Sequence, residues 1–250
     1  MEPSPWSWTP AWGEVGAVVV MSAAYWLGAR RLGTTRGRAA AFAAGQLLLL
    51  ALFMTPVESL SLHYLLSAHL LQNVALAEWA PALAVLGLTP PMADRLASLA
   101  LVRLATRPYV ALPLWVGAYG IWHIPALYDA ALRNPSGLLP LEHATYFLAG
   151  LALWWPVLHE EPWRLTAGAK AVYLFAAFVL ASPLGLLFAL LPNPLYEFYV
   201  DAPRIWGLSP LEDQQVAGVL MAGSEAIVFF GALAWFVAEF MREEASYSPR

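Results

Sequence analysis

Side chains of the kinds that bind metal ions recur along this chain, and histidines are the foremost of them. The best candidates for metal ligands are the imidazoles of His69, His123 and His143. Imidazole is the commonest metal ligand in proteins and suits both copper and zinc. The residues predicted to complete or support such a site are Asp213, Gln215, Met54, Met221 and His63. A methionine thioether among the ligands would add a preference for Cu(I).

Amide side chains near these residues are predicted to orient the ligands as a supporting layer. Gln72 and Asn73 follow His69 by three and four residues and so share its helix face. Gln214 is expected to play the same supporting part near the start of the last helix. The alternative for the two methionines is core packing. A single histidine near a helix end is also more often an interfacial, hydrogen-bonded residue than a ligand.

The composition indicates what kind of protein must position these residues. Of the 250 residues, 60% are hydrophobic and only 12% are charged, with a mean hydropathy of +0.60. Soluble proteins carry about 25% charged residues, whereas runs that cross ~30 Å of hydrocarbon must be apolar. We therefore expect an all-α polytopic membrane bundle that forms one domain over residues 1–250. Nucleic acid is not an expected partner, since Lys170 is the single lysine.

Seven apolar segments are predicted to cross the lipid bilayer as helices. They are 13–30, 37–58, 62–88, 109–128, 138–159, 168–191 and 210–241. Of the 13 Lys and Arg residues, all but Arg133 and Arg204 fall on one side of this arrangement. The positive-inside rule makes that side cytoplasmic, so the N-terminus lies outside and the C-terminus inside. The expected location is the cytoplasmic membrane.

The helix directions place the candidate ligands at a common depth near the outer face. His69 lies about two turns into the third segment, His123 near the outer end of the fourth and His143 near the outer start of the fifth. Pro125 is predicted to kink the fourth segment and turn His123 inward. His159 falls at the opposite, cytoplasmic end.

The connecting segments and two deeper carboxyl groups complete this outline. The sequence 209–212 (SPLE) is a helix start, with an N-cap serine, a proline at the first position and a capping-box glutamate. Loop 89–108 is expected to hold one amphipathic helix around Met92–Ala105. Glu78 and Glu225 lie deeper in the bilayer, where a carboxyl serves either a proton or ion path or a hydrogen bond between helices.

Three stretches in combination resemble the bacterial CtaG family, multi-spanning assembly factors for caa-type cytochrome c oxidases. They are 67–72 (SAHLLQ), 122–132 (WHIPALYDAAL) and 209–218 (SPLEDQQVAG), supported by 142–143 (EH) and 154–156 (WWP). The positions that match the family motif are His69, Gln72, His123, Asp129, His143, Asp213 and Gln215. The family commonly carries histidine where this chain has Asn73.

The resemblance implies a function in assembling haem–copper oxidase, through copper delivery or insertion. The chain would then be a metallochaperone rather than an enzyme, with oxidase subunits as its partners and Asp129 as a supporting residue. A membrane-embedded zinc hydrolase is the alternative, with Asp213 beside an activated water. A third possibility is a transporter or a haem-binding electron carrier. Transport needs a polar path through both halves of the bilayer, and the ligand-type residues are confined to one half.

Overall fold

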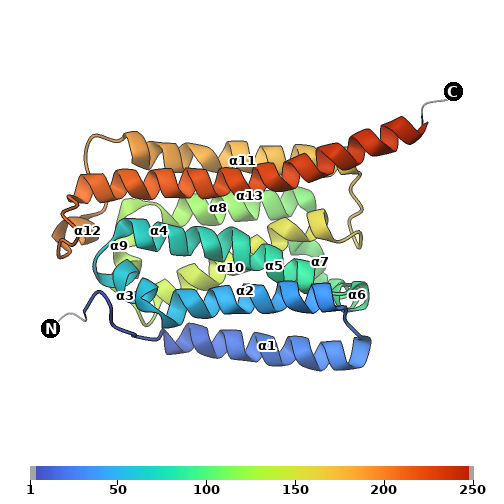
Figure 1. Cartoon of the computed structure of the whole chain (residues 1–250), viewed down its shortest axis with the longest axis horizontal. Helices are drawn as coiled ribbons and strands as arrows, with labels where there is room; N and C mark the ends of the chain where they lie inside the picture. The colour runs from blue at the N-terminus through green and yellow to red at the C-terminus, as the bar shows by residue number, and fades with distance from the viewer. Residues whose placement is uncertain (1–3, 248–250) are drawn as a thin grey trace.

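The computed structural model describes residues 4–247 as a bundle whose longer helices run along one common axis (Figure 1). Within this part of the chain there is no strand. The longer helices are α1 (Trp12–Leu32), α2 (Arg36–Met54), α8 (Pro108–Trp122), α10 (Leu138–Leu158), α11 (Ala167–Leu190) and α13 (Pro210–Tyr247). The shorter ones are α3 (Pro56–His63), α4 (Leu66–Val74), η1 (Ala75–Trp79), α5 (Ala80–Gly87), α6 (Pro90–Ala97), α7 (Ala100–Ala105), α9 (Pro125–Leu132) and α12 (Glu197–Asp201).

Four helical stretches of the described chain are long and apolar enough to cross a membrane. They are Arg36–Met54, Leu66–Gly87, Ala167–Leu190 and Pro210–Ala245. A fifth candidate is the pair α8 and α9, taken as one broken span. Helices α1 and α10 have 21 residues each and run beside the others, but they are not among these candidates.

The stretch Leu66–Gly87, which joins α4, η1 and α5, is the centre of the bundle. In the most apolar 18 residues of this stretch, 72% of the residues are buried inside the protein, against 33–39% in the other three stretches. Pro81 explains the π-helical turn η1, because proline has no N–H for the carbonyl of Ala77 four residues earlier. That carbonyl accepts the indole N–H of Trp115 instead, at 3.1 Å. Gly150 of α10 allows the close approach, since a methyl group there would collide with the Ala77 carbonyl.

The structure corrects two of the predicted segment boundaries and the helix expected in loop 89–108. The second segment ends at Met54, because Thr55 caps a new helix, α3, that begins with Pro56. The third therefore begins at Leu66, after the chain leaves helical geometry between α3 and α4. The single amphipathic helix expected around Met92–Ala105 is two helices, α6 and α7, separated by Ser98 and Leu99.

The predicted kink before Pro125 is confirmed and is sharp. Helix α8 ends at Trp122, and α9 leaves it at an angle of 76°. Pro125 takes the first position of α9, where its missing N–H costs nothing. The fourth predicted segment is therefore not one straight helix. His123 lies at the corner between α8 and α9.

The last helix begins as predicted and packs closely on its neighbour. The Ser209 hydroxyl and backbone N–H both donate to the Glu212 carboxylate, at 2.7 and 2.8 Å, and the Glu212 N–H donates back to the hydroxyl at 3.2 Å. Helix α13 then packs along α11, where a methyl group on Gly218 would collide with the backbone of Ala189 and Gly185. The absence of a side chain at Gly218 therefore sets the distance between the two helices.

Substituting Gly218 tests this close packing. We expect Gly218→Ala to lower the free energy of unfolding by about 1–3 kcal/mol, because the added methyl forces α11 and α13 apart. Gly223→Ala on the same helix is the control. No atom lies within 4 Å of its added methyl, so alanine should stabilise the helix by up to about 1 kcal/mol. Thermal unfolding in detergent measures both, and equal effects of the two changes would refute the packing role.

Candidate metal-binding site

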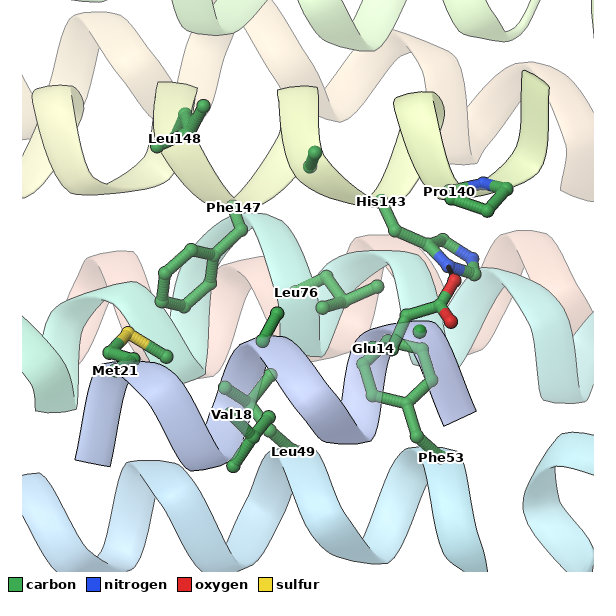
Figure 2. Close-up of a pocket in the computed structure, with 13 residues that line it drawn as sticks. Glu14, Val18, Met21, Leu49, Phe53, Leu76, Pro140, His143, Phe147 and Leu148 are labelled. Atoms are coloured by element: carbon green, nitrogen blue, oxygen red, sulfur yellow. Dashed lines mark hydrogen bonds and ion pairs between the residues drawn. The ribbon is translucent and has the colours of Figure 1, made fainter. Parts of the chain in front are cut away.

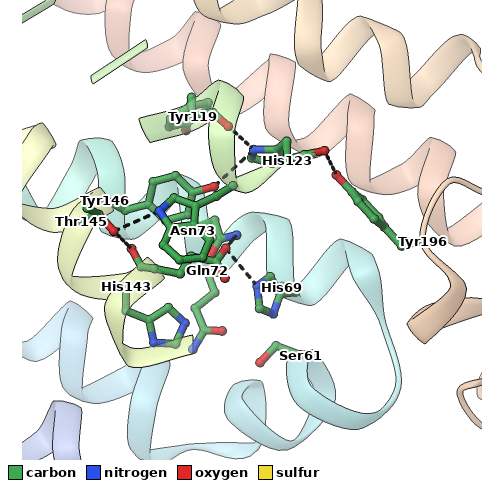
Figure 3. Close-up of polar contacts among 12 residues, drawn as sticks. Ser61, His69, Gln72, Asn73, Tyr119, His123, His143, Thr145, Tyr146 and Tyr196 are labelled. Atoms are coloured by element: carbon green, nitrogen blue, oxygen red, sulfur yellow. Dashed lines mark hydrogen bonds and ion pairs between the residues drawn. The ribbon is translucent and has the colours of Figure 1, made fainter. Parts of the chain in front are cut away.

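The three histidines predicted as ligands lie buried near one end of the bundle, on three different helices. His69 is on α4, His123 caps the C-terminus of α8 and His143 is on α10, with exposures of 0%, 5% and 3%. Figure 3 shows the three rings around the side chains of Gln72 and Asn73. We call this group of three buried histidines the histidine layer. His159 lies outside it, at the other end of α10, and its Nε2 bonds to the carbonyl of Val85.

His123 is held in a defined orientation by its own helix and by α10. Its Nδ1 lies 2.8 Å from the carbonyl oxygen of Tyr119 and 3.2 Å from the hydroxyl of Tyr146. A carbonyl can only accept, so Nδ1 carries the ring hydrogen and Nε2 holds the lone pair. No hydrogen-bond partner reaches this buried Nε2. A ring fixed through one nitrogen, with the other left as a base, is the usual arrangement of a metal-binding histidine.

His143 is fixed in a similar way by a residue from the first helix. Its Nδ1 lies 3.1 Å from the carboxyl of Glu14, while its buried Nε2 has no hydrogen-bond partner. The two side chains meet at one end of an apolar cavity of about 390 Å³ between α1, α2 and α10 (Figure 2). Met21 and Phe147 line its other end. This pair is therefore the polar end of a largely apolar space.

His69 has the least constrained ring of the three. Neither of its nitrogens has a hydrogen-bond partner, and Nε2 lies 3.9 Å from the Glu142 carboxyl, which is beyond hydrogen-bonding distance. Glu142 is fully buried, and one of its oxygens accepts from the Asn73 amide at 3.1 Å. The other carboxyl oxygen is unpartnered. Glu142 and His69 thus present further donor atoms to the histidine layer.

Tyrosine rings occupy the space between the histidines. The Tyr128 ring centroid lies 5.3 Å from that of His69 and 5.7 Å from that of His123, and its buried hydroxyl has no hydrogen-bond partner. Tyr196 stacks on Tyr128 and donates to the His123 carbonyl. The ring centroids of His69 and His143 are 6.4 Å apart. Among the described residues, no three His, Asp or Glu side chains lie close enough together to hold a metal ion.

The layer carries donor types that copper and zinc prefer. Three buried imidazoles each present a nitrogen without a hydrogen-bond partner, and the Glu142 oxygen that lies 3.9 Å from His69 also accepts from Asn73. A buried polar atom without a partner costs free energy, so a ligand that binds these atoms would be stabilising. The candidate donors are His69, His123, His143 and Glu142.

Two of the predicted acidic residues cap helices. The Asp213 carboxyl accepts from the Leu66 N–H at 2.7 Å, the Ser67 N–H at 3.1 Å and the Ser67 hydroxyl at 2.6 Å, and so caps the start of α4. Asp129 accepts the N–H groups at the start of α12, each at 3.2 Å. Three hydrogen bonds engage the Asp213 carboxyl, which leaves it poorly placed to activate a water molecule.

The amides near the start of α13 and of the central helix also have structural partners. Gln214 bonds to the backbone of Asn193 and Leu195 and so ties the loop before α12 to α13. Gln72 donates to the carboxyl of Glu58, at 2.8 Å. Glu58 lies on α3, outside the candidate spans, and burial raises its pKa to about 7. Gln72 thus connects the histidine layer to a carboxyl on α3.

The remaining candidates lie around the layer. Met221 is buried in the apolar core and Met54 packs against it, so both are packing residues. Gln215 is half-buried on the first turns of α13. His63 lines a separate cavity of about 410 Å³, together with Glu14 and Glu58.

Sequence analysis did not select Glu14, Glu58 or Glu142 as site residues. Glu142 is adjacent to His143 in the sequence, yet the two side chains point to different helices. The sequence offered one indication for Glu142, which is its position next to His143 near a helix start. That position does not show which neighbouring helix the Glu142 side chain faces.

The fold and the histidine layer define a helical multi-pass membrane protein with unpartnered ligand-type atoms near one end of its bundle. Residues 23–243 match the family described as cytochrome c oxidase caa3 assembly factor (Caa3_CtaG). The chain therefore belongs to this family of cytochrome c oxidase assembly factors, as its motifs indicated. No curated protein and no solved structure matches the chain.

The cap on α4 can be tested through stability. We expect Asp213→Ala to lower the free energy of unfolding by about 3 kcal/mol, because three buried donors lose their acceptor. Glu212→Ala is the control, since this neighbouring carboxyl makes its capping bonds at the exposed surface and should matter less. Thermal unfolding of the purified protein in detergent compares the two. A smaller loss for Asp213→Ala than for Glu212→Ala would contradict the capping role.

Proposed function

We propose that this protein supports cytochrome c oxidase assembly by holding a copper ion in the histidine layer and passing it to an oxidase subunit. His69, His123 and His143 are the proposed ligands, with Glu142 beside them. The observation that carries the proposal is the set of buried imidazole nitrogens without hydrogen-bond partners. Zinc would suit the same nitrogens and is the alternative metal.

The proposed topology puts this layer on the outer side of the bacterial cytoplasmic membrane. Seven crossings are proposed, made by α1, α2, the stretch α4 to α5, α8, α10, α11 and α13. An odd number of crossings puts the termini on opposite sides. The Lys and Arg distribution favours an outer N-terminus and a cytoplasmic C-terminus. Copper centres served from the outer side would then be within reach of the layer.

The contacts of the layer suit a cargo that must leave again. His143 is oriented by Glu14 from α1, and Glu14 also lines the cavity that contains His63 and Glu58. This cavity and the apolar one share Glu14, and His143 lines the apolar one, so the layer borders a cavity. Asp213 does not support the hydrolase alternative, because its oxygens cap α4.

Metal content tests the proposed ligands directly. We expect the purified wild-type protein, loaded with Cu(I) and desalted, to retain copper, and the double variant His69→Ala/His123→Ala to lose most of it. His159→Ala is the matched control, because this buried histidine lies outside the layer and should leave copper retention unchanged. Elemental analysis for copper and zinc gives the result. Equal copper content in the wild type and the double variant would refute the site. Stoichiometric zinc in the wild type would show that the bound metal is zinc and not copper.

Asn73 offers a gain-of-function test at the same site. Its amide contacts Glu142, which lies next to His69. A histidine there would add a fourth imidazole to the layer, so Asn73→His should tighten Cu(I) binding by about tenfold or more, as extra ligands do. Asn73→Leu, which adds no donor atom, is the control. Competition with a chromogenic Cu(I) chelator measures both, and weaker binding by Asn73→His would contradict the placement of Asn73.

A further inference from the structure

An apolar cavity of about 400 Å³ lies at the end of the bundle away from the histidine layer, where Figure 1 shows α6. Helices α1, α2, α5, α6 and α10 form its walls. Each of them contributes apolar side chains, such as Leu32, Phe42, Val85, Met92 and Leu151. Pockets of ~300–1,000 Å³ hold small molecules in proteins. The cavity is therefore large enough for an apolar ligand.

Close packing holds the walls of this cavity in place. The Tyr25 ring stacks on Phe42 with centroids 3.7 Å apart, and its hydroxyl donates to the Gly87 carbonyl at 3.1 Å. Gly87 in turn lies against Phe42, where an added methyl group would collide. Trp155, from α10, donates its indole N–H to the carbonyl of Glu161 at 3.0 Å. The cavity is thus a feature of packed helices and not of a loop.

The apolar space extends along α1 toward the other end of the bundle. Met21 lines this cavity and also the apolar cavity that contains Glu14 and His143. On α1, the residues that line the two cavities run from Gly13 to Leu32, which is about 28 Å at ~1.5 Å per residue. An elongated space of this kind suits a flexible hydrocarbon chain.

Two arginines place positive charge where the cavity opens to the surface. Arg95, on α6, is exposed and is the one charged residue among the described residues that line the cavity. Arg38, on α2, is half-buried and donates to the carbonyls of Leu86 and Leu88, of which Leu88 lines the cavity. Within the described chain, neither arginine forms an ion pair, and Asp94 beside Arg95 does not line the cavity. An anionic group would complement this charge.

We propose that this cavity binds an anionic phospholipid of the bilayer, with an acyl chain inside it and the phosphate group at Arg95 and Arg38. Lipid chains already lie in hydrocarbon, so the acyl chain gains by filling a void whose lining lacks packing contacts. The selectivity comes from the headgroup, because guanidinium binds phosphate through charge-assisted hydrogen bonds. Basic pockets between transmembrane helices bind the headgroups of anionic lipids in this way. Such a lipid would join α6 to α1 and α2, which all line the cavity.

Filling the cavity tests the place of the acyl chain. The full chain, purified in detergent and stripped of lipid, is mixed with phosphatidylglycerol and examined by native mass spectrometry. The wild type should retain the lipid, and Ala24→Phe should lose it, because the ring enters the cavity from α1. Ala23→Phe is the matched control, since Ala23 is an exposed alanine of the same helix that does not line the cavity.

Gly28→Leu fills the same cavity one turn further along α1, in case Ala24→Phe does not fold. Equal retention by the filled variants and by Ala23→Phe would overturn the lipid site, and so would a wild type that retains no phospholipid. A lipid-free wild type that forms a dimer, which Ala24→Phe disrupts, would also overturn it and assign the cavity to a second copy of the chain.

Competition between phosphatidylglycerol and the zwitterionic phosphatidylcholine tests the headgroup contact. The wild type should prefer phosphatidylglycerol, and Arg95→Gln should lower this preference about fivefold, as the loss of one basic residue near an anionic headgroup does. Arg103→Gln is the control, because it removes an exposed arginine of α7 that does not line the cavity. Equal effects of the two variants would overturn the contact between Arg95 and the phosphate. Neither measurement contains copper, so the outcome is independent of the proposed function.

Discussion

The hydrogen bonds between Asp213 and the start of α4 join the last helix of the chain to the central one. Helix starts leave backbone N–H groups without partners, and hydrocarbon offers no water to satisfy them. Asp213 supplies that acceptor from α13, with Ser67 as an additional donor to it. His69 lies on the first turns of α4 and is held in place by this cap. The position of the histidine layer therefore depends on a contact between residues almost 150 positions apart.

Two prolines determine the local backbone at His123 and at Glu78. Pro125 stops α8 at His123, so this ring lies at a corner and faces the other helices. Pro81 frees the Ala77 carbonyl and creates the π-helical turn that bears Glu78. The Trp115 indole from α8 bonds to the freed Ala77 carbonyl, and the Tyr196 hydroxyl bonds to the His123 carbonyl at the corner.

The polar groups of the interior form a connected series. Glu14 orients His143, Glu142 lies between Asn73 and His69, and Tyr119 joins His123 to Glu78. Several donor atoms remain without partners throughout this series. A structural network in a membrane protein is normally fully satisfied. We therefore propose the unpartnered imidazole nitrogens as the ligands of an exchangeable metal ion.

The sequence alone determined the helical class, the family, the helix start at Ser209 and the kink at Pro125. Hydropathy and helix direction give each residue a depth, because a helix rises by a fixed ~1.5 Å per residue. They do not give the rotation of a helix about its axis or the identity of its neighbours. Only the tertiary structure could therefore decide that Asp213 and Asp129 cap helices, and that Glu142 and Glu14 flank the histidines.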